Sequence, residues 1–142
     1  MIALAGEARE VALAEAQAVL AAGGAAAGLV AEIDEGEVVE EVERLEQILE
    51  LGLQSGRIRA LYGPGGEQAA LGVYRRLPRG AEAAESAREV SKALAALAGR
   101  ELRSVELRAV GPGAFSLSLA AGELELDLRL DRQGARLGSV GV

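Results

Sequence analysis

Residues 100–131 read RELRSVELRAVGPGAFSLSLAAGELELDLRLD, and the fold class follows from this stretch. Side chains of a β-strand point to opposite faces in turn, so strict alternation of apolar and polar residues indicates a half-buried strand. Glycine-containing turns at 111–113 and 121–122 separate the alternating segments. The stretch therefore predicts an antiparallel meander with one buried face, built from Ser104–Ala109, Ala114–Ala120 and Glu123–Asp131.

Four further segments lie on either side of the meander or next to it in the expected order of elements. Ala5–Ala22 is rich in strong helix formers and is followed by Gly23-Gly24, so we expect an N-terminal Ala-rich helix. Residues 25–33 fit a loop, a strand or more helix equally well. Ala81–Ala98 predicts a helix before Gly99, with an apolar stripe of Ala83, Ala87, Val90, Leu94 and Leu97. Residues 135–142 predict an extended tail in which Val140 and Val142 pair with a neighbouring strand.

The acidic segment 37–53 predicts a helix that packs on the sheet. Its apolar residues recur at intervals of four, three, four and four, which is the helical period, at positions Val38, Val42, Leu45, Leu49 and Leu53. We expect its carboxylates to lie on the outer side, at positions Glu40, Glu43, Glu46 and Glu50.

The segment 57–77 fits two structures. Arg57–Tyr62 alternates as a strand does, and Gly63-Pro64-Gly65-Gly66 has the composition of a turn. Gln68–Leu77 fits either a strand, with Ala69, Leu71, Val73 and Leu77 on one face, or a helix, with Ala70, Leu71, Tyr74 and Leu77 on one stripe. We favour the strand, because a glycine turn that follows a strand predicts a hairpin.

The composition limits the chemistry that the chain can perform. It has no Cys and no His, which excludes disulfides, thiolate nucleophiles, the usual zinc sites and the standard general base near neutral pH. The net charge of −7 argues against non-specific nucleic-acid binding. An Arg-rich, Cys-free chain is also typical of thermophiles. With an acidic N-terminal segment and no long apolar run, we expect a cytoplasmic protein without a membrane span or cofactor.

Candidate functional groups each have a simpler structural explanation. The run Arg75, Arg76 and Arg79 is a candidate for contacting an anionic ligand or an acidic partner surface. The glycine turn lacks the ending of a phosphate-binding loop. Alternation places the carboxylates of 123–131 on the polar face, where Arg108 or Arg129 can pair with them more readily than a metal can. We therefore expect no catalytic or metal site, and no enzyme.

The expected element order resembles the roadblock (dynein light chain) domain family, in its bacterial or archaeal form. The likeness lies in Leu45–Leu49 leading into Gly56–Tyr62 and Gly65-Gly66-Glu67, in Ala81–Leu97, and in Ala135–Val140. The resemblance implies an α+β fold with an antiparallel five-stranded sheet flanked by helices over residues 37–142. Residues 1–36 would then be an additional N-terminal helical extension.

The same resemblance implies a non-enzymatic regulator or scaffold that forms a homodimer and binds a small Ras-like GTPase. An unpaired sheet edge beside a helix with a small-residue flank also favours a homodimer, with a contact at Ala84, Ala87, Ser91 and Val105. Two alternatives stay open. If Glu67–Leu77 is helical, residues 56–77 resemble a bacterial response-regulator-associated domain, which implies a ligand sensor. The other is a small enzyme that uses carboxylates or Arg.

Overall fold

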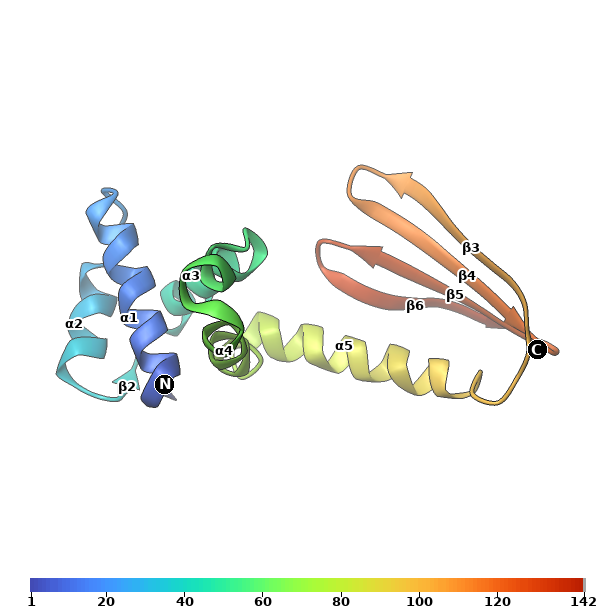
Figure 1. Ribbon diagram of the computed structural model, residues 1–142, viewed down its shortest axis with the longest axis horizontal. Coiled ribbons are helices and arrows are strands. Elements are labelled where there is room, and N and C mark those ends of the chain that lie inside the picture. The colour runs from blue at the N-terminus through green and yellow to red at the C-terminus, as the bar shows by residue number, and fades with distance from the viewer. Residues whose placement is uncertain (142) are drawn as a thin grey trace. The chain divides into compact units, whose positions relative to one another are not determined.

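The computed structural model describes residues 1–141 and has an α+β fold (Figure 1). The chain divides into two compact units, a helical unit of residues 1–81 and a sheet unit of residues 82–141. The described helices are α1 (Gly6–Ala21), α2 (Ala27–Glu35), α3 (Val42–Gln54), α4 (Arg57–Tyr74) and α5 (Pro78–Ala95). The described strands are β1 (Ile2–Ala3), β2 (Val38–Val39), β3 (Leu102–Gly111), β4 (Ala114–Ala121), β5 (Leu124–Asp131) and β6 (Gly134–Gly141).

The helical unit is built around an aliphatic core to which α1 to α4 all contribute. Its largest fully buried side chains include Leu4, Leu29, Ile33, Leu45, Leu49, Ile58 and Leu77. β1 pairs antiparallel with β2 and so joins the N-terminal residues to the segment before α3. We expected a domain boundary after residue 36, whereas in the structure residues 1–36 pack in the same unit as α3 and α4, and the units divide after Ala81.

The strands expected at 57–62 and 68–77 are wrong, because helix α4 contains residues 57–62 and 68–74, and residues 75–77 form the turn after it. Buried residues follow the helical period through its second half, at Gly66, Ala70 and Val73 and then at Leu77 beyond its end. The glycine turn is a kink between two helical stretches and not a hairpin. Gly63 has φ of 73°, which only glycine adopts freely, and Pro64 follows at a position where a helix start needs no N–H.

Helix α3 starts later than expected and packs on helices rather than on the sheet. It begins at Val42, because Val38 and Val39 form the short strand β2. Leu45 and Leu49 are buried in the helical core as predicted from their spacing, but Val38 is 48% exposed. Glu46 was placed on the outer side and is instead buried, which the contacts described below explain.

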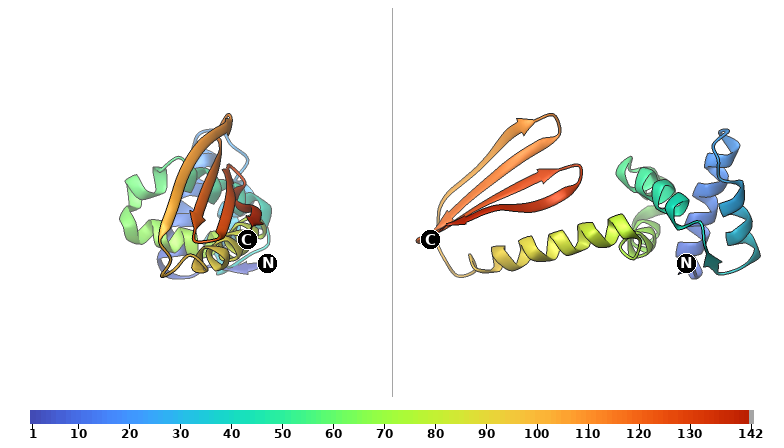
Figure 2. Two further views of the ribbon diagram at one scale, coloured as in Figure 1. Left: turned by 90° about the vertical axis from the view of Figure 1, so that its right-hand side faces the viewer. Right: turned by 180° about the vertical axis from the view of Figure 1, so that it is seen from behind.

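The sheet unit confirms the antiparallel meander, with four strands instead of the five expected. The strand order is β3-β4-β5-β6, and every neighbouring pair is antiparallel (Figure 2). The expected tail is strand β6, in which Val140 pairs with Leu126, while Val142 lies outside the described residues. The remaining helix, α5, starts at Pro78, three residues before the expected start, and ends at Ala95.

Side chains from one helix cap the end of another throughout the helical unit. The Arg9 guanidinium of α1 donates to the backbone carbonyls of Ile33 and Gly36 at the end of α2, with Nη2 to Ile33 O at 2.6 Å. The Glu32 carboxylate of α2 accepts from the backbone N–H groups of Glu40 and Glu41 at the start of α3. Helix ends leave unpaired C=O groups, and Arg9 satisfies one in the last turn of α2, while Glu32 fixes the two residues that lead into α3.

Candidate interaction surface

The strand register gathers the apolar side chains of the meander on one face of the sheet. Residues paired across an antiparallel sheet project to the same face. One row across the four strands is Leu107, Leu117, Leu128 and Leu137, and the next is Val105, Leu119, Leu126 and Val140. A third row is Ala109, Phe115, Leu130 and Ala135. The face is thus aliphatic from one edge to the other, as the alternation predicts.

The centre of this apolar face is buried, and its edges are not. Leu126 and Leu128 on β5 are 2% and 3% exposed. Helix α5 runs along the sheet in this unit (Figures 1 and 2), and its Val90 is buried too. Leu94 and Leu97 of the same stripe are half-buried. One helix is too narrow to cover four strands, so the outer strands of the sheet unit keep apolar side chains in contact with solvent, Val110 of β3 at 48% exposure among them.

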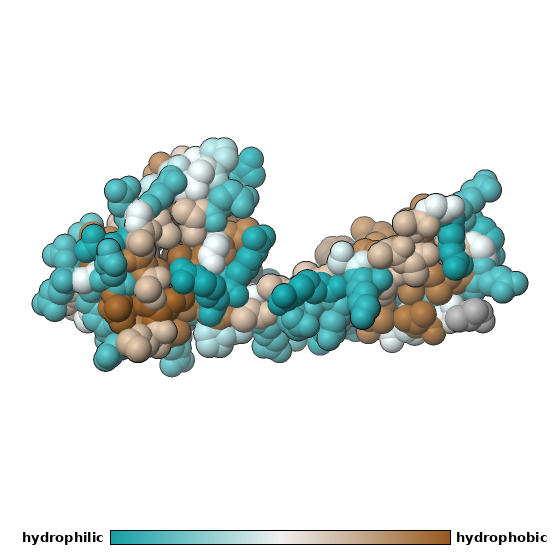
Figure 3. All heavy atoms as spheres, turned by 90° about the horizontal axis from the view of Figure 1, so that it is seen from below, coloured by the Kyte–Doolittle hydropathy of each residue, from teal (hydrophilic) through white to brown (hydrophobic). Residues whose placement is uncertain are grey.

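The exposed apolar side chains lie mainly on the two edge strands. They are Leu102, Val105 and Leu107 on β3, Phe115 on β4, and Leu137 and Val140 on β6, each between 41% and 59% exposed. Every one of the ten residues of β3 is exposed. Figure 3 shows hydrophobic atoms on the surface of the sheet unit beside α5. Apolar patches of this kind, at the edge of a sheet, are typical of protein-binding surfaces.

The opposite face of the sheet is polar and internally hydrogen-bonded. Ser118 donates to Asp127 Oδ1 at 2.6 Å, and Ser139 donates to Asp127 Oδ2 at 2.9 Å, so a Ser-Asp-Ser row crosses three strands. These two hydrogen bonds hold the pKa of Asp127 below its usual value, because they favour the charged carboxylate. Asp131 pairs across the sheet with Arg136 of β6, an arginine that the sequence did not indicate, whereas Arg129 contacts Asp131 and Arg108 contacts Glu106 along their own strands.

The residues expected at a dimer contact all belong to the sheet unit. Ala87 and Ser91 are exposed on α5, and Ala84 is half-buried. Val105 lies on the edge strand β3 and is 56% exposed. A partner can therefore reach at least part of each of the four side chains. Three of them lie on α5 and the fourth lies on β3, within the same unit.

The three arginines expected to face an anionic partner are not equivalent. Arg79, in the first turn of α5, contacts Glu46 at 3.5 Å and Glu50 at 3.2 Å, so its charge is used within the helical unit. Its pKa is raised by the hydrogen bond to Glu50. Arg76 donates to the carbonyl of Ala3 at 3.3 Å, and Arg75 is exposed. They do not form one anion site.

Glu46 is buried because it closes the start of α5. Its Oε2 accepts the backbone N–H of Arg79 at 2.9 Å, and its Oε1 lies 3.5 Å from the Arg79 guanidinium. A carboxylate at a helix N-terminus is stabilised by the unpaired N–H groups and by the helix dipole. Nearby Tyr74 has a raised pKa, caused first by burial and then by the charges of Glu50 and Glu46.

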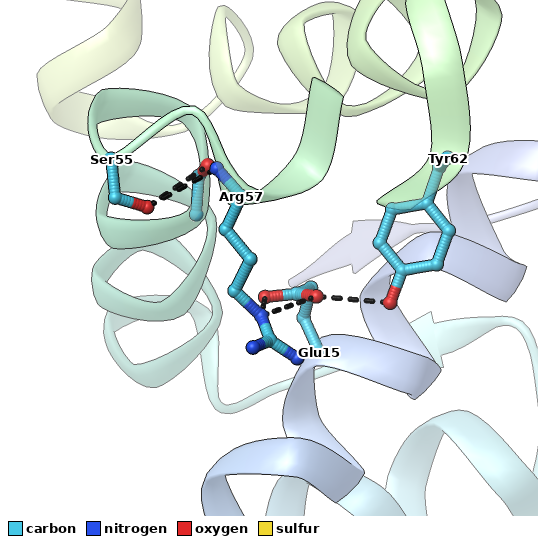
Figure 4. Close-up of polar contacts among 5 residues, drawn as sticks. Glu15, Ser55, Arg57 and Tyr62 are labelled. Carbon is cyan, nitrogen blue, oxygen red and sulfur yellow. Dashed lines mark hydrogen bonds and ion pairs between the residues drawn. The ribbon is translucent and has the colours of Figure 1, made fainter. Parts of the chain in front are cut away.

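A second buried carboxylate, Glu15 of α1, holds α1 against α4 (Figure 4). It is 3% exposed and accepts from Arg57 Nε at 3.0 and 3.1 Å and from the Tyr62 hydroxyl at 2.9 Å. Burial, followed by the hydrogen bond to Glu15, raises the pKa of Tyr62. Gly52 of α3 lies next to this group. Any larger residue there would place its Cβ 2.6 Å from Ile58 Cδ1 and 3.3 Å from Glu15 Oε2, so the close approach requires glycine.

These contacts read as structural rather than catalytic chemistry. Among residues 1–141, each buried side-chain polar atom has a hydrogen-bond partner, so Glu15 and Glu46 are satisfied by the protein itself. The part of the chain that the structure describes has no cluster of three acidic residues able to hold a metal ion. Of the helices described, none has the length and apolar character needed to cross a bilayer.

Sequence reasoning missed both buried carboxylates. Glu15 and Glu46 each lie in a helix with several other acidic residues, and nothing local distinguishes them from the exposed ones. Their partners, Arg57 and Arg79, are 42 and 33 residues further along the chain. For Glu46 the one available signal was the excess of arginine in residues 57–79 beside the acidic segment 32–50, which is consistent with ion pairs between the two segments but does not single out Glu46.

Comparisons of the chain with known protein families, with curated proteins and with solved structures found no match.

Proposed function

We propose that this chain is a non-enzymatic regulatory or scaffolding protein that binds another protein through the edges of its sheet. The observation that carries the proposal is the row of exposed apolar side chains on β3 and β6. Burying a leucine that is half exposed in the free chain gains roughly 1 kcal/mol, so several such residues together support a specific contact. The satisfied polar groups of the helical unit fit a scaffold better than a reaction centre.

The partner class that we propose, from the resemblance, is a small Ras-like GTPase. This part of the proposal has less support than the surface itself, because two segments on which the likeness rests are helical in α4. A pull-down with Ras-like GTPases loaded with GDP or with a GTP analogue tests it. We expect binding that depends on the nucleotide. Equal capture in both states would refute a nucleotide-dependent regulator, and no capture would leave the sheet edges to a partner of another class.

A variant at β6 links such binding to the surface. Leu137 is 41% exposed on the apolar face, so Leu137→Arg adds a charge without burying it. We expect the variant to fold as the parent does and to lose the GTPase. Arg132→Ala, in the turn between β5 and β6, is a control at an exposed position outside the apolar rows. A GTPase that binds Leu137→Arg as tightly as the parent chain would exclude this edge as its contact.

The helical state of 68–77 favours a second candidate function, a ligand-sensing domain. The alternative expected from the sequence required this segment to be a helix, and its residues 68–74 lie in α4. A sensor is stabilised by the ligand that its folded state binds. Unfolding of the helical unit in the presence of individual nucleotides and small anions tests this function, and an unchanged midpoint with each would exclude those ligands.

A further inference from the structure

We propose that two copies of this chain pair through strand β3, centred on Leu107, to form one continuous eight-stranded sheet. The proposal rests on the proposed function in one respect: both take the exposed sheet edges as protein-binding surfaces, and here a second copy of the chain occupies the edge at β3. It is carried by the register of the meander, the exposure of β3 and the order of charges along it.

The backbone of β3 offers a regular, unpaired edge. A two-residue turn closes on a hydrogen-bonded pair, and the turns at 112–113, 122–123 and 132–133 all have this length. Counting from them, Ser104, Glu106 and Arg108 are the residues of β3 between its two register shifts that bond to β4. The N–H and C=O groups of Val105, Leu107 and Ala109 therefore point away from the sheet. Register shifts occur only near the two ends, between Leu102 and Ser104 and between Ala109 and Gly111.

The charges on β3 select one two-fold register. A two-fold axis perpendicular to the sheet at Leu107 places Leu107 opposite its own copy and Val105 opposite Ala109 of the other chain. On the polar face it places Glu106 of each chain opposite Arg108 of the other chain, which gives two pairs of opposite charge. Centring on Glu106 or on Arg108 instead would place like charges opposite each other, which is destabilising. In the single chain Glu106 and Arg108 are 4.0 Å apart and more than half exposed, so both remain available.

The other edge of the sheet is less suited to pairing. Strand β6 contains Gly138 at a register shift opposite Asp127 and Leu128, and Gly134 and Gly141 at its ends. Bulges and glycines in an edge strand interrupt regular pairing. A contact of β3 with β6 of another copy would also be heterologous and would build a ring or an open chain, whereas β3 with β3 closes on itself.

Charge reversal tests the register directly. We expect Glu106→Arg and Arg108→Glu each to be monomeric by light scattering at micromolar concentration, where the parent chain has twice the mass of one chain. When the two variants are mixed, opposite charges again face each other, so a heterodimer should form. The double variant carrying both changes should dimerise as the parent does. Circular dichroism of each variant checks that the meander is intact.

A single introduced cysteine gives a second readout, because the chain has none of its own. Paired residues at a hydrogen-bonded position have Cα atoms about 5.5 Å apart, within the range of a disulfide. Leu107→Cys should therefore cross-link two copies under mild oxidation. Ser104→Cys is the matched control on the same strand: it lies roughly 20 Å from its counterpart in this register and should stay uncross-linked.

Three results would overturn the proposal. These are a monomeric parent chain, a dimer that neither charge reversal weakens, and cross-linking of Ser104→Cys in preference to Leu107→Cys. Assemblies that grow beyond two chains would show a heterologous contact instead. A failure to bind a GTPase does not bear on the dimer, because the variant that tests GTPase binding lies on β6. A monomeric chain that captures a GTPase would refute the dimer and leave the proposed function standing.

Discussion

Replacing Arg57 by alanine tests whether the buried carboxylate of Glu15 depends on its cationic partner. Glu15 is 3% exposed, and without Arg57 its only remaining side-chain donor is the Tyr62 hydroxyl at 2.9 Å. Breaking a buried ion pair by removing one partner costs about 3–5 kcal/mol. The Arg57 side chain is 49% exposed, so water can reach the space it leaves. We therefore expect the free energy of unfolding to fall by about 2–3 kcal/mol.

Tyrosine fluorescence during urea unfolding measures this loss in the helical unit alone. The chain has two tyrosines and no tryptophan, and both tyrosines, Tyr62 and Tyr74, belong to the helical unit. Arg59→Ala is the matched control. The Arg59–Glu67 pair at 3.6 Å is more exposed, at 67% and 25%, and should contribute less than about 1 kcal/mol. Equal losses in the two variants would mean that Glu15 is hydrated and that the argument from burial is wrong.

Further expectations concern the helical core, one tyrosine and the polar face of the sheet. Leu45→Ala should lower the free energy of unfolding by about 2–5 kcal/mol, because Leu45 is fully buried, and urea titration should show almost no loss for the surface variant Glu43→Ala. The pKa of Tyr62 is higher in the folded chain than in the unfolded chain, where it is near 10. The stabilisation that Tyr62 provides is therefore complete below pH 10 and is lost as the pH rises through the pKa of the folded chain. Absorbance at 295 nm should show Tyr62 ionising at a higher pH in the native chain than in urea. Ser118→Ala should raise the pKa of Asp127 toward its ordinary value, measured by NMR titration, and an unchanged pKa would show that this hydrogen bond is absent in solution.

Local alternation was enough to predict the meander, and local periodicity failed where it was ambiguous. Each strand from β3 to β5 has one residue type per face, and each pairs with its sequence neighbour, so no long-range information was needed. In α4, by contrast, the apolar run Ala69-Ala70-Leu71 satisfies the strand and the helix periods together. The helix is the observed state because Ala70 and Val73 reach the core of the helical unit.

The candidate surface could be predicted in part. The exposure of Val105 follows from its place in a strand with one free edge, and the pattern that identified the strand also identified this residue. The position of the fourth strand was not predicted from the same pattern, since Gly134, Gly138 and Gly141 interrupt the alternation in β6. The partners of Glu15 and Glu46 depend on how four helices pack, which no single segment specifies.

The caps on the helix ends share a direction along the chain. Arg9 closes α2, Glu32 closes the start of α3, and Glu46 closes the start of α5, so each capping side chain precedes in sequence the helix end that it serves. A chain leaves the ribosome from its N-terminus at about 5–20 residues per second, slowly compared with helix formation. Each helix end therefore emerges when its cap has already been made. At α2, α3 and α5 the helical unit is therefore suited to assemble in the order of its synthesis, because the helix that supplies the contact is in place first.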